Sequence, residues 1–149
     1  MFFKKKKKLD LLLVENIKTG CAPVSKEEAI HNVGKILVDT GYVKEDYIEA
    51  MIEREKTYST FMGSGLALPH GVEAAKKEVL SSGIAIMTFE QPISWDGEEV
   101  LIVIGVAGVG EDHLNILSII CEKMLDETTA SSLIKGSADE IYKILAEKE

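Results

Sequence analysis

Three residues of this 149-residue chain, His70, His113 and Arg54, combine a chemically versatile side chain with a position next to glycines or at the end of an expected element. A neutral imidazole can act as a nucleophile near neutral pH or offer an N–H donor. A guanidinium presents a planar fork of donors that clamps carboxylate or phosphate groups. The set is suited to holding a phosphoryl group.

His70 lies in the segment 59–71, STFMGSGLALPHG. The short apolar run between glycines predicts a buried strand, and Pro69 favours an extended conformation for the residue before it. We therefore expect His70 at a strand end, on a stiff turn beside Gly71, where the missing β-carbon lets another molecule approach. This position suits a nucleophile, and an ordinary turn histidine is the alternative.

Arg54 is the single arginine of a chain that has sixteen lysines. It falls in the same helical row as Tyr47 and Met51, so its side chain leaves the helix close to the apolar seam, five residues before Ser59. A lone arginine at such a place favours a two-pronged clamp on a carboxylate or phosphate, which lysine provides poorly. The alternative is a cation that the dipole favours at a helix C-terminus.

His113 follows the apolar run Val100–Val106 and a glycine-containing loop. Asp112 is the expected N-cap of the next helix, which puts His113 in the first turn. The positive end of the helix dipole favours a neutral imidazole there, so the ring can donate an N–H group to an anion. A histidine that merely starts the helix is the alternative. His113 and His70 both follow strand ends, where ligands bind in α/β sheets.

Apolar spacing and end signals predict the helices that position these side chains. Helices are expected over residues 25–40, 44–56, 112–125, 128–134 and from 137 onward. Capping boxes at Ser25–Glu28 and Ser137–Glu140 mark two of the starts. His31 is expected on the solvent face of the first helix. The inner face of the helix over 112–125 is predicted to hold Leu114, Leu117, Ile120, Cys121, Met124 and Leu125.

Strands are expected between residues 11 and 20, in the apolar run 66–68, over 83–89 and over 100–106. Turns are expected at Pro92, Asp96 and Gly97. The continuous β-branched run Val100–Val106 is typical of a central strand buried on both faces, so helices must cover both sides of the sheet. These elements predict an α/β fold, and the chain length suits a single domain.

Composition predicts a globular, acidic protein. Apolar residues make up 46% of the chain and the formal net charge is −8, although Lys4–Lys8 contribute five positive charges. The acidic remainder argues against nucleic-acid binding. We assign residues 1–10 to a Lys-rich tail and residues 11–149 to one folded domain.

The start of the chain does not resemble a secretory signal, because Asp10 interrupts its apolar residues. No apolar run is long enough to insert across a bilayer. Cys21 and Cys121 lie far apart, without CxxC or metal-ligand spacing. These features favour a reduced, cytoplasmic setting.

Several other chemistries lack the residues that they need. His70 and His113 have no third clustered ligand of the kind that catalytic zinc requires. Ser64 sits in GSG, not in the G-x-S-x-G elbow of serine hydrolases. Walker A and dinucleotide fingerprints are absent, so we expect no ATP or NAD bound through them. We expect no metal and no other cofactor.

From about Leu12 to its C-terminus the sequence contains VENI, SKEEAI, GYV, AMIEREK, LALPHG and HLNIL. In these motifs it resembles the enzyme IIA components of the fructose–mannitol class of the bacterial phosphoenolpyruvate-dependent sugar phosphotransferase system. It is most similar to the mannitol-specific members. The resemblance implies a mixed, mostly parallel sheet of about five strands with helices on both faces.

By this resemblance His70 would be the phosphorylated histidine, which accepts from phospho-HPr and donates to a cysteine of enzyme IIB. His113 and Arg54 would match the family's second histidine and its arginine. The chain has no IIB cysteine motif, so IIB is expected to be separate and linked to a membrane IIC transporter. Ser64 departs from members that have an acidic residue there. A regulatory nitrogen-branch or fructose-type IIA protein, whose His70 phosphorylation controls partner binding, is the alternative.

Overall fold

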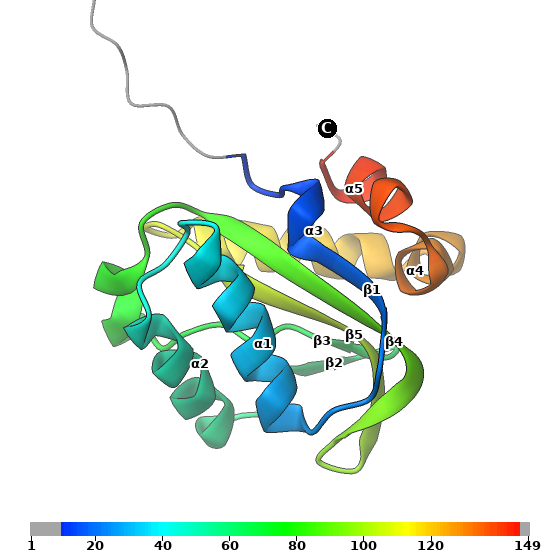
Figure 1. Ribbon diagram of the computed structural model, residues 1–149, viewed down its shortest axis with the longest axis horizontal. Coiled ribbons are helices and arrows are strands. Elements are labelled where there is room, and N and C mark those ends of the chain that lie inside the picture. Colours follow the sequence, from blue (N-terminus) through cyan, green and yellow to red (C-terminus); the bar gives the residue numbers. More distant parts are fainter. Residues whose placement is uncertain (1–9, 147–149) are drawn as a thin grey trace, which may run out of the picture.

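The computed structural model describes residues 10–146, in which five strands lie between two layers of helices (Figure 1). The helices are α1 (Lys26–Asp39), α2 (Asp46–Thr57), α3 (Asp112–Met124), α4 (Glu127–Lys135) and α5 (Ala138–Ala146). The strands are β1 (Ile17–Cys21), β2 (Phe61–Gly63), β3 (Leu66–Ala67), β4 (Gly83–Trp95) and β5 (Glu98–Ala107). Two 3-10 turns are η1 (Val14–Asn16) and η2 (Glu73–Glu78). Residues 1–9 of the expected Lys-rich tail lie outside the described residues.

The sheet is mixed, as expected, with strand order β1-β4-β5-β3-β2. β1 pairs with β4, and β3 with β5, in parallel, whereas β4 with β5 and β2 with β3 are antiparallel. The run predicted to be the central strand is β5, which lies in the middle of this order. Because β3 and β5 are parallel neighbours, the chain leaves both strands at the same edge of the sheet. The segments that carry His70 and His113 therefore start side by side.

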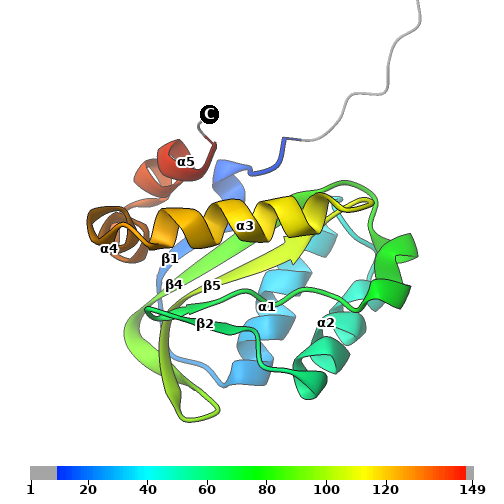
Figure 2. The same ribbon diagram turned by 180° about the vertical axis from the view of Figure 1, so that it is seen from behind.

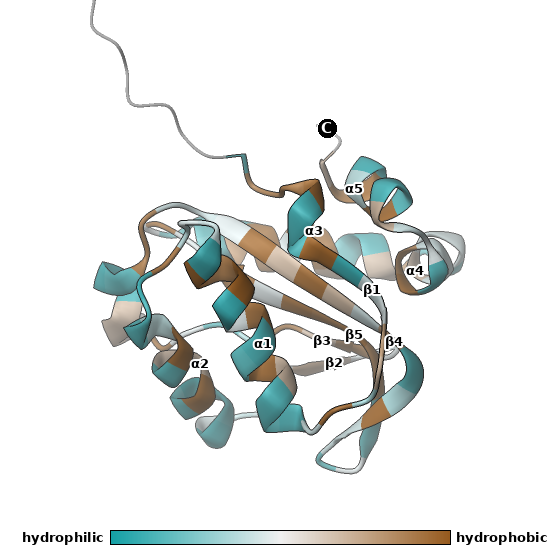
Figure 3. Ribbon diagram, viewed as in Figure 1, coloured by the Kyte–Doolittle hydropathy of each residue, from teal (hydrophilic) through white to brown (hydrophobic). Residues whose placement is uncertain are grey.

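Helices α1 and α2 cover one face of the sheet, and α3, α4 and α5 cover the other (Figures 1 and 2). Ile30 and Met51 are buried in the core of the first face, and Ile120 and Ile141 in that of the second. Apolar residues run through the middle of β4 and β5, while α1 and α2 alternate between apolar and polar residues (Figure 3). Burial of each large apolar side chain stabilises the fold by about 1.5–3 kcal/mol.

Both predicted capping boxes are confirmed. The Ser25 hydroxyl accepts from the Glu28 amide at 3.1 Å, and the Glu28 carboxylate accepts from the Ser25 amide at 3.1 Å. Ahead of α5, the Ser137 hydroxyl likewise accepts from the Glu140 amide at 3.2 Å, and the Glu140 carboxylate accepts from the Ser137 amide at 2.8 Å. His31 is exposed on α1, also as expected.

The turn predicted at Pro92 is wrong, because β4 continues through this residue. The turn is confined to Asp96 and Gly97, whose φ angles of 56° and 94° are left-handed. The pairing of β4 with β5 shifts register between Thr88 and Ile93. A proline is tolerated in a strand where the ladder is irregular, because no regular bond needs its missing N–H group.

The predicted inner face of α3 is wrong at two positions. Leu114 and Leu125 are 55% and 82% exposed. Ile120 and Met124 are buried as predicted, and Ile116, which was not predicted, is the third buried residue of α3. Two neighbouring rows of α3 are apolar, and the way the helix lies on the sheet decides which row is covered.

Candidate active site

His70 lies in an extended segment that main-chain hydrogen bonds hold against β5 and against the residue before β2. The Val106 amide of β5 donates to the Pro69 carbonyl at 2.9 Å, and the Leu68 amide donates to the Thr60 carbonyl at 3.0 Å. His70 itself forms an isolated parallel bridge with Val106. His70 therefore follows the end of β3, as expected, but it lies in an extended bridge to β5 and not on the expected turn.

The ring of His70 is half-buried and has a defined tautomer. Its Nδ1 atom lies 2.8 Å from the Leu68 carbonyl oxygen. A carbonyl oxygen can only accept, so Nδ1 carries the hydrogen and Nε2 keeps its lone pair. Burial lowers the pKa of His70 below its ordinary value of 6.5, and the Leu68 bond partly opposes this effect. The ring is therefore neutral near neutral pH.

His113 lies in the first turn of α3, as expected, with its ring near that of His70. The two ring centroids are 6.2 Å apart and the ring planes are tilted by 35°. Gly108 lets the loop after β5 pack closely against the start of α3, because a β-carbon there would lie 2.2 Å from the His113 amide nitrogen. Within residues 10–146, Nδ1 of His113 is buried without a hydrogen-bond partner. Such a nitrogen costs free energy, which favours a functional role for the ring over a purely structural one.

Asp112 is not the N-cap of α3, contrary to expectation. Glu111 occupies that position and makes no side-chain cap bond. The Asp112 carboxylate instead accepts from the Ser82 hydroxyl at 2.7 Å, and the same hydroxyl accepts from the Val109 amide at 2.9 Å. A partner from the segment before β4, which no local pattern identifies, thus fixes the loop in front of His113.

Arg54 is half-buried near the C-terminal end of α2. Its Nη1 group donates to the Tyr58 carbonyl at 3.0 Å, and its guanidinium lies 5.6 Å from the centre of the Tyr58 ring. Tyr58 is the C-cap of α2, so the helix-end role considered above is present. The positive charge of Arg54 also contributes to lowering the pKa of His70. In the described part of the chain it makes no hydrogen bond to either histidine of the site.

Sequence reasoning missed Glu55, which is only 5% exposed. Its carboxylate accepts from the Thr60 amide at 3.0 Å, the Thr60 hydroxyl at 2.6 Å and the Trp95 indole N–H at 2.9 Å. Lys26 Nζ lies 3.8 Å away. Glu55 follows Met51 by one helical turn on the buried side of α2, where a charged residue is unusual, and that signal could have identified it.

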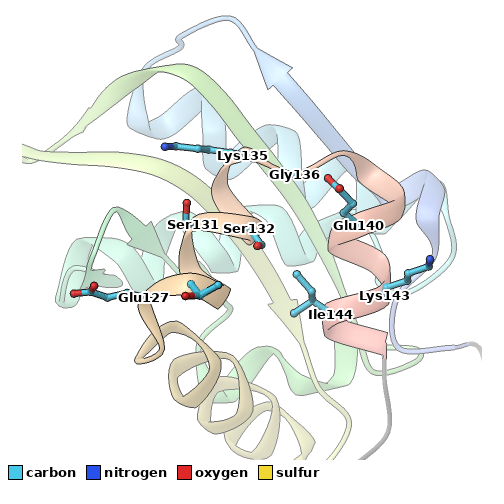
Figure 4. A pocket seen from close by; sticks show the side chains of 9 residues that line it. Glu127, Ser131, Ser132, Lys135, Gly136, Glu140, Lys143 and Ile144 are labelled. Carbon is cyan, nitrogen blue, oxygen red and sulfur yellow. The ribbon is translucent and has the colours of Figure 1, made fainter.

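The candidate site is distinct from the larger grooves of the surface. A groove of about 780 Å³ between α4 and α5 has Lys135, Glu140 and Lys143 among its lining residues (Figure 4). It contains none of the three candidate residues.

Across residues 10–146, no three His, Cys, Asp or Glu side chains gather as a metal ion would require. None of the described helices has both the length and the hydropathy needed to cross a bilayer.

A family model described as "Phosphoenolpyruvate-dependent sugar phosphotransferase system, EIIA 2" matches residues 10–148. This chain belongs to the EIIA 2 family. The resemblance seen in the sequence motifs is therefore confirmed, and with it the prediction of an enzyme IIA phosphotransferase component.

Relatives of this EIIA chain include two mannitol-specific phosphotransferase enzyme IIA components. That of Halalkalibacterium halodurans is 44% identical over 138 residues, which cover 92% of this chain and 95% of the relative. That of Bacillus subtilis is 45% identical over 133 residues, which cover 89% and 93%. Both alignments span nearly the whole of both proteins.

Solved structures of EIIA proteins share the fold. The crystal structure of mannitol IIA from Escherichia coli superposes with a TM-score of 0.81 at 33% identity, over 88% of this chain and 96% of that one. An Escherichia coli mannitol enzyme IIA, solved in complex with phosphorylated mannitol enzyme IIB, gives a TM-score of 0.82 at 32% identity, over 90% and 96%. The predicted mixed sheet with helices on both faces is confirmed as the fold of this EIIA chain.

Proposed function

We propose that this EIIA protein accepts a phosphoryl group from phospho-HPr on Nε2 of His70 and passes it to a cysteine of a separate, mannitol-specific IIB component. The observation that carries the proposal is the 2.8 Å hydrogen bond between His70 Nδ1 and the Leu68 carbonyl oxygen. It leaves Nε2 as the ring nitrogen with a free lone pair. The nucleophilic nitrogen is therefore selected before a partner arrives.

The lowered pKa of His70, which burial causes, keeps the ring neutral and nucleophilic at neutral pH. In the first transfer, Nε2 forms a bond to phosphorus while the bond between phosphorus and the donor's nitrogen breaks. The leaving electron pair stays on the donor's nitrogen. In the second transfer a IIB thiolate attacks phosphorus, and the pair of the N–P bond returns to Nε2 of His70.

The protein's part in both steps is to position the groups and to stabilise charge on the phosphoryl oxygens. His113 supports this role because its ring lies 6.2 Å from that of His70, centroid to centroid. Arg54 supports it through its positive charge and through the donors left after its one bond to the Tyr58 carbonyl. We assign charge stabilisation to His113 and Arg54, and nucleophilic attack to His70.

We assign mannitol as the sugar because two relatives, 44% and 45% identical to this chain, are named as mannitol-specific enzyme IIA components. We assign IIB as the acceptor because a structural neighbour was solved in complex with phosphorylated mannitol IIB. In this proposal IIB serves a membrane IIC transporter, residues 11–149 act as the IIA unit, and the protein works in the cytoplasm. Cys21 and Cys121 are both free, in keeping with a reducing compartment.

A regulatory role in the nitrogen branch is the second candidate. A nitrogen regulatory IIA protein of Neisseria meningitidis shares the fold, with a TM-score of 0.77. Its identity to this chain is 26%, against 44% for the mannitol-specific relative from Halalkalibacterium halodurans. The difference favours the sugar carrier.

The experiment that tests the proposal is incubation with phospho-HPr, followed by addition of mannitol IIB or other sugar IIB proteins. We expect one phosphoryl group per chain, acid-labile and alkali-stable as a phosphoramidate is, and onward transfer to mannitol IIB. His70→Ala removes labelling. His31→Ala, which changes an exposed histidine on α1, is the matched control and keeps it.

Phosphate recovered on a serine, or labelling that survives His70→Ala, would overturn the assignment of the nucleophile. A protein that is phosphorylated on His70 but passes the group to none of the sugar IIB proteins would support the regulatory role instead.

A further inference from the structure

The hydroxyl of Tyr47 joins β5 to Gly71, the residue that follows His70. The Gly71 amide donates to this hydroxyl at 2.8 Å, and the hydroxyl donates to the Val106 carbonyl at 2.9 Å. One hydroxyl can accept and donate at the same time, so both bonds coexist. The side chain of Tyr47 comes from α2 and is buried, with 4% of its surface exposed.

The bridge falls at a defined rung of the sheet. The Val106 amide donates to the Pro69 carbonyl at 2.9 Å, which holds the chain before His70 directly against β5. In a parallel ladder the following bond would run from the Gly71 amide to the Val106 carbonyl. The Tyr47 hydroxyl accepts from this Gly71 amide and donates to this Val106 carbonyl. A side chain therefore takes part in holding the main chain on the far side of His70 to β5.

The fit around this hydroxyl is close. A β-carbon at Gly71 would lie 2.5 Å from the Tyr47 ring, so only glycine allows the contact. Burial raises the pKa of Tyr47 to about 12, which keeps the hydroxyl protonated and able to donate. Arg54 lies two helical turns further along α2. The same helix is thus bonded to the residue after His70 and carries the cation of the site.

We propose that Tyr47 is a positioning residue for phosphoryl transfer, which holds the main chain at His70 through Gly71 and Val106 without touching the phosphoryl group. This inference rests on the proposed function of His70 as the phosphorylated residue. Because in-line transfer needs the attacking nitrogen at a set distance and angle, a displacement of about 1 Å costs roughly a hundredfold in rate.

The test compares Tyr47→Phe with Tyr42→Phe. Tyr42 is a matched control, because its side chain is also buried and its hydroxyl also donates to a main-chain carbonyl, that of Asp10. Single-turnover transfer from phospho-HPr is measured at a temperature at which both variants are folded by circular dichroism. We expect Tyr47→Phe to transfer about ten- to a hundredfold more slowly and Tyr42→Phe to transfer at the wild-type rate.

A second readout does not depend on transfer. In ¹⁵N-edited NMR spectra of the unphosphorylated protein, we expect wild type and Tyr42→Phe to show His70 with its proton on Nδ1. Tyr47→Phe should show altered His70 ring shifts or a mixture of tautomers. Wild-type transfer together with a wild-type His70 spectrum in Tyr47→Phe would overturn the proposal, as would equal losses in both variants.

If Tyr47→Phe does not fold, 3,5-difluorotyrosine placed at position 47 keeps the hydroxyl but makes it more acidic. Transfer should then fall at alkaline pH, where the hydroxyl loses the proton that it donates to Val106, while the same label at position 42 leaves the profile unchanged. Identical profiles would reject the proposal. If wild type takes no group from phospho-HPr, the proposed function fails, and the NMR comparison still decides whether Tyr47 positions His70.

Discussion

The imidazole rings of His70 and His113 lie 6.2 Å apart, centroid to centroid, although one follows β3 and the other opens α3 after β5. Parallel pairing of β3 with β5 brings the two segments to the same edge of the sheet. The two rings nevertheless differ. Nδ1 of His70 bonds the Leu68 carbonyl, whereas Nδ1 of His113 is buried without a partner among the described residues.

This difference predicts separate phenotypes. His113→Ala should still be phosphorylated on His70, but about a hundredfold or more slowly, because loss of one oriented donor costs a few kcal/mol of barrier. Transfer from phospho-HPr to the variant, and from the variant to IIB, measures the effect. Wild-type rates in both directions would leave His113 as a residue that only starts α3, and an inert variant would mean that the two roles are shared.

Arg54→Lys should impair transfer far more than Lys143→Arg, an exchange in the opposite direction at an exposed position. Lysine keeps the charge but loses the planar fork of donors. Single-turnover rates measured side by side provide the comparison. If the lysine variant transfers normally, Arg54 serves α2 through the Tyr58 carbonyl and nothing more.

The pKa of His70 should lie below 6.5, chiefly because of burial and further because of the positive charge of Arg54, while the Leu68 carbonyl and Glu55 act in the opposite direction. NMR titration of the ring measures it directly. The single-turnover rate should stay level as the pH falls through 6.5 and decline only when the ring protonates. A pKa of His70 at or above that value would contradict the prediction.

The same shift affects stability. Between the lowered pKa of folded His70 and the ordinary value of 6.5, the unfolded chain binds more protons than the folded one, so the free energy of unfolding rises with pH across this window. His70→Gln should remove this contribution. Urea unfolding of both proteins at a series of pH values tests it, and parallel curves would count against the prediction.

Glu55→Ala should lower the free energy of unfolding by about 3 kcal/mol or more, because it leaves the Thr60 amide and the Trp95 indole N–H buried without their acceptor. Glu53→Ala is the control on the same helix. Glu53 contacts Lys56 at 3.8 Å with both side chains exposed, so its loss should cost less than about 1 kcal/mol. Equal values from urea unfolding would show that the Glu55 contacts add no stability.

Sequence alone was enough for the features that depend on neighbours along the chain. The capping boxes at Ser25 and Ser137 locate two helix starts, since their bonds close within four residues. Pro69 restricts the chain next to His70 through its own ring. The β-branched run of β5 is apolar on both faces, so it predicts a central strand wherever its partners lie.

Tertiary packing decided the rest, because the deciding contacts join residues that are distant in the chain. Periodicity identifies an apolar row on α3 but not which of two rows the sheet covers, so Leu114 was misplaced and Ile116 was missed. The bridge that Tyr47 makes exists only once α2 packs beside β5. The hydrogen bond from the Trp95 indole to the buried Glu55 carboxylate likewise forms only where β4 meets α2.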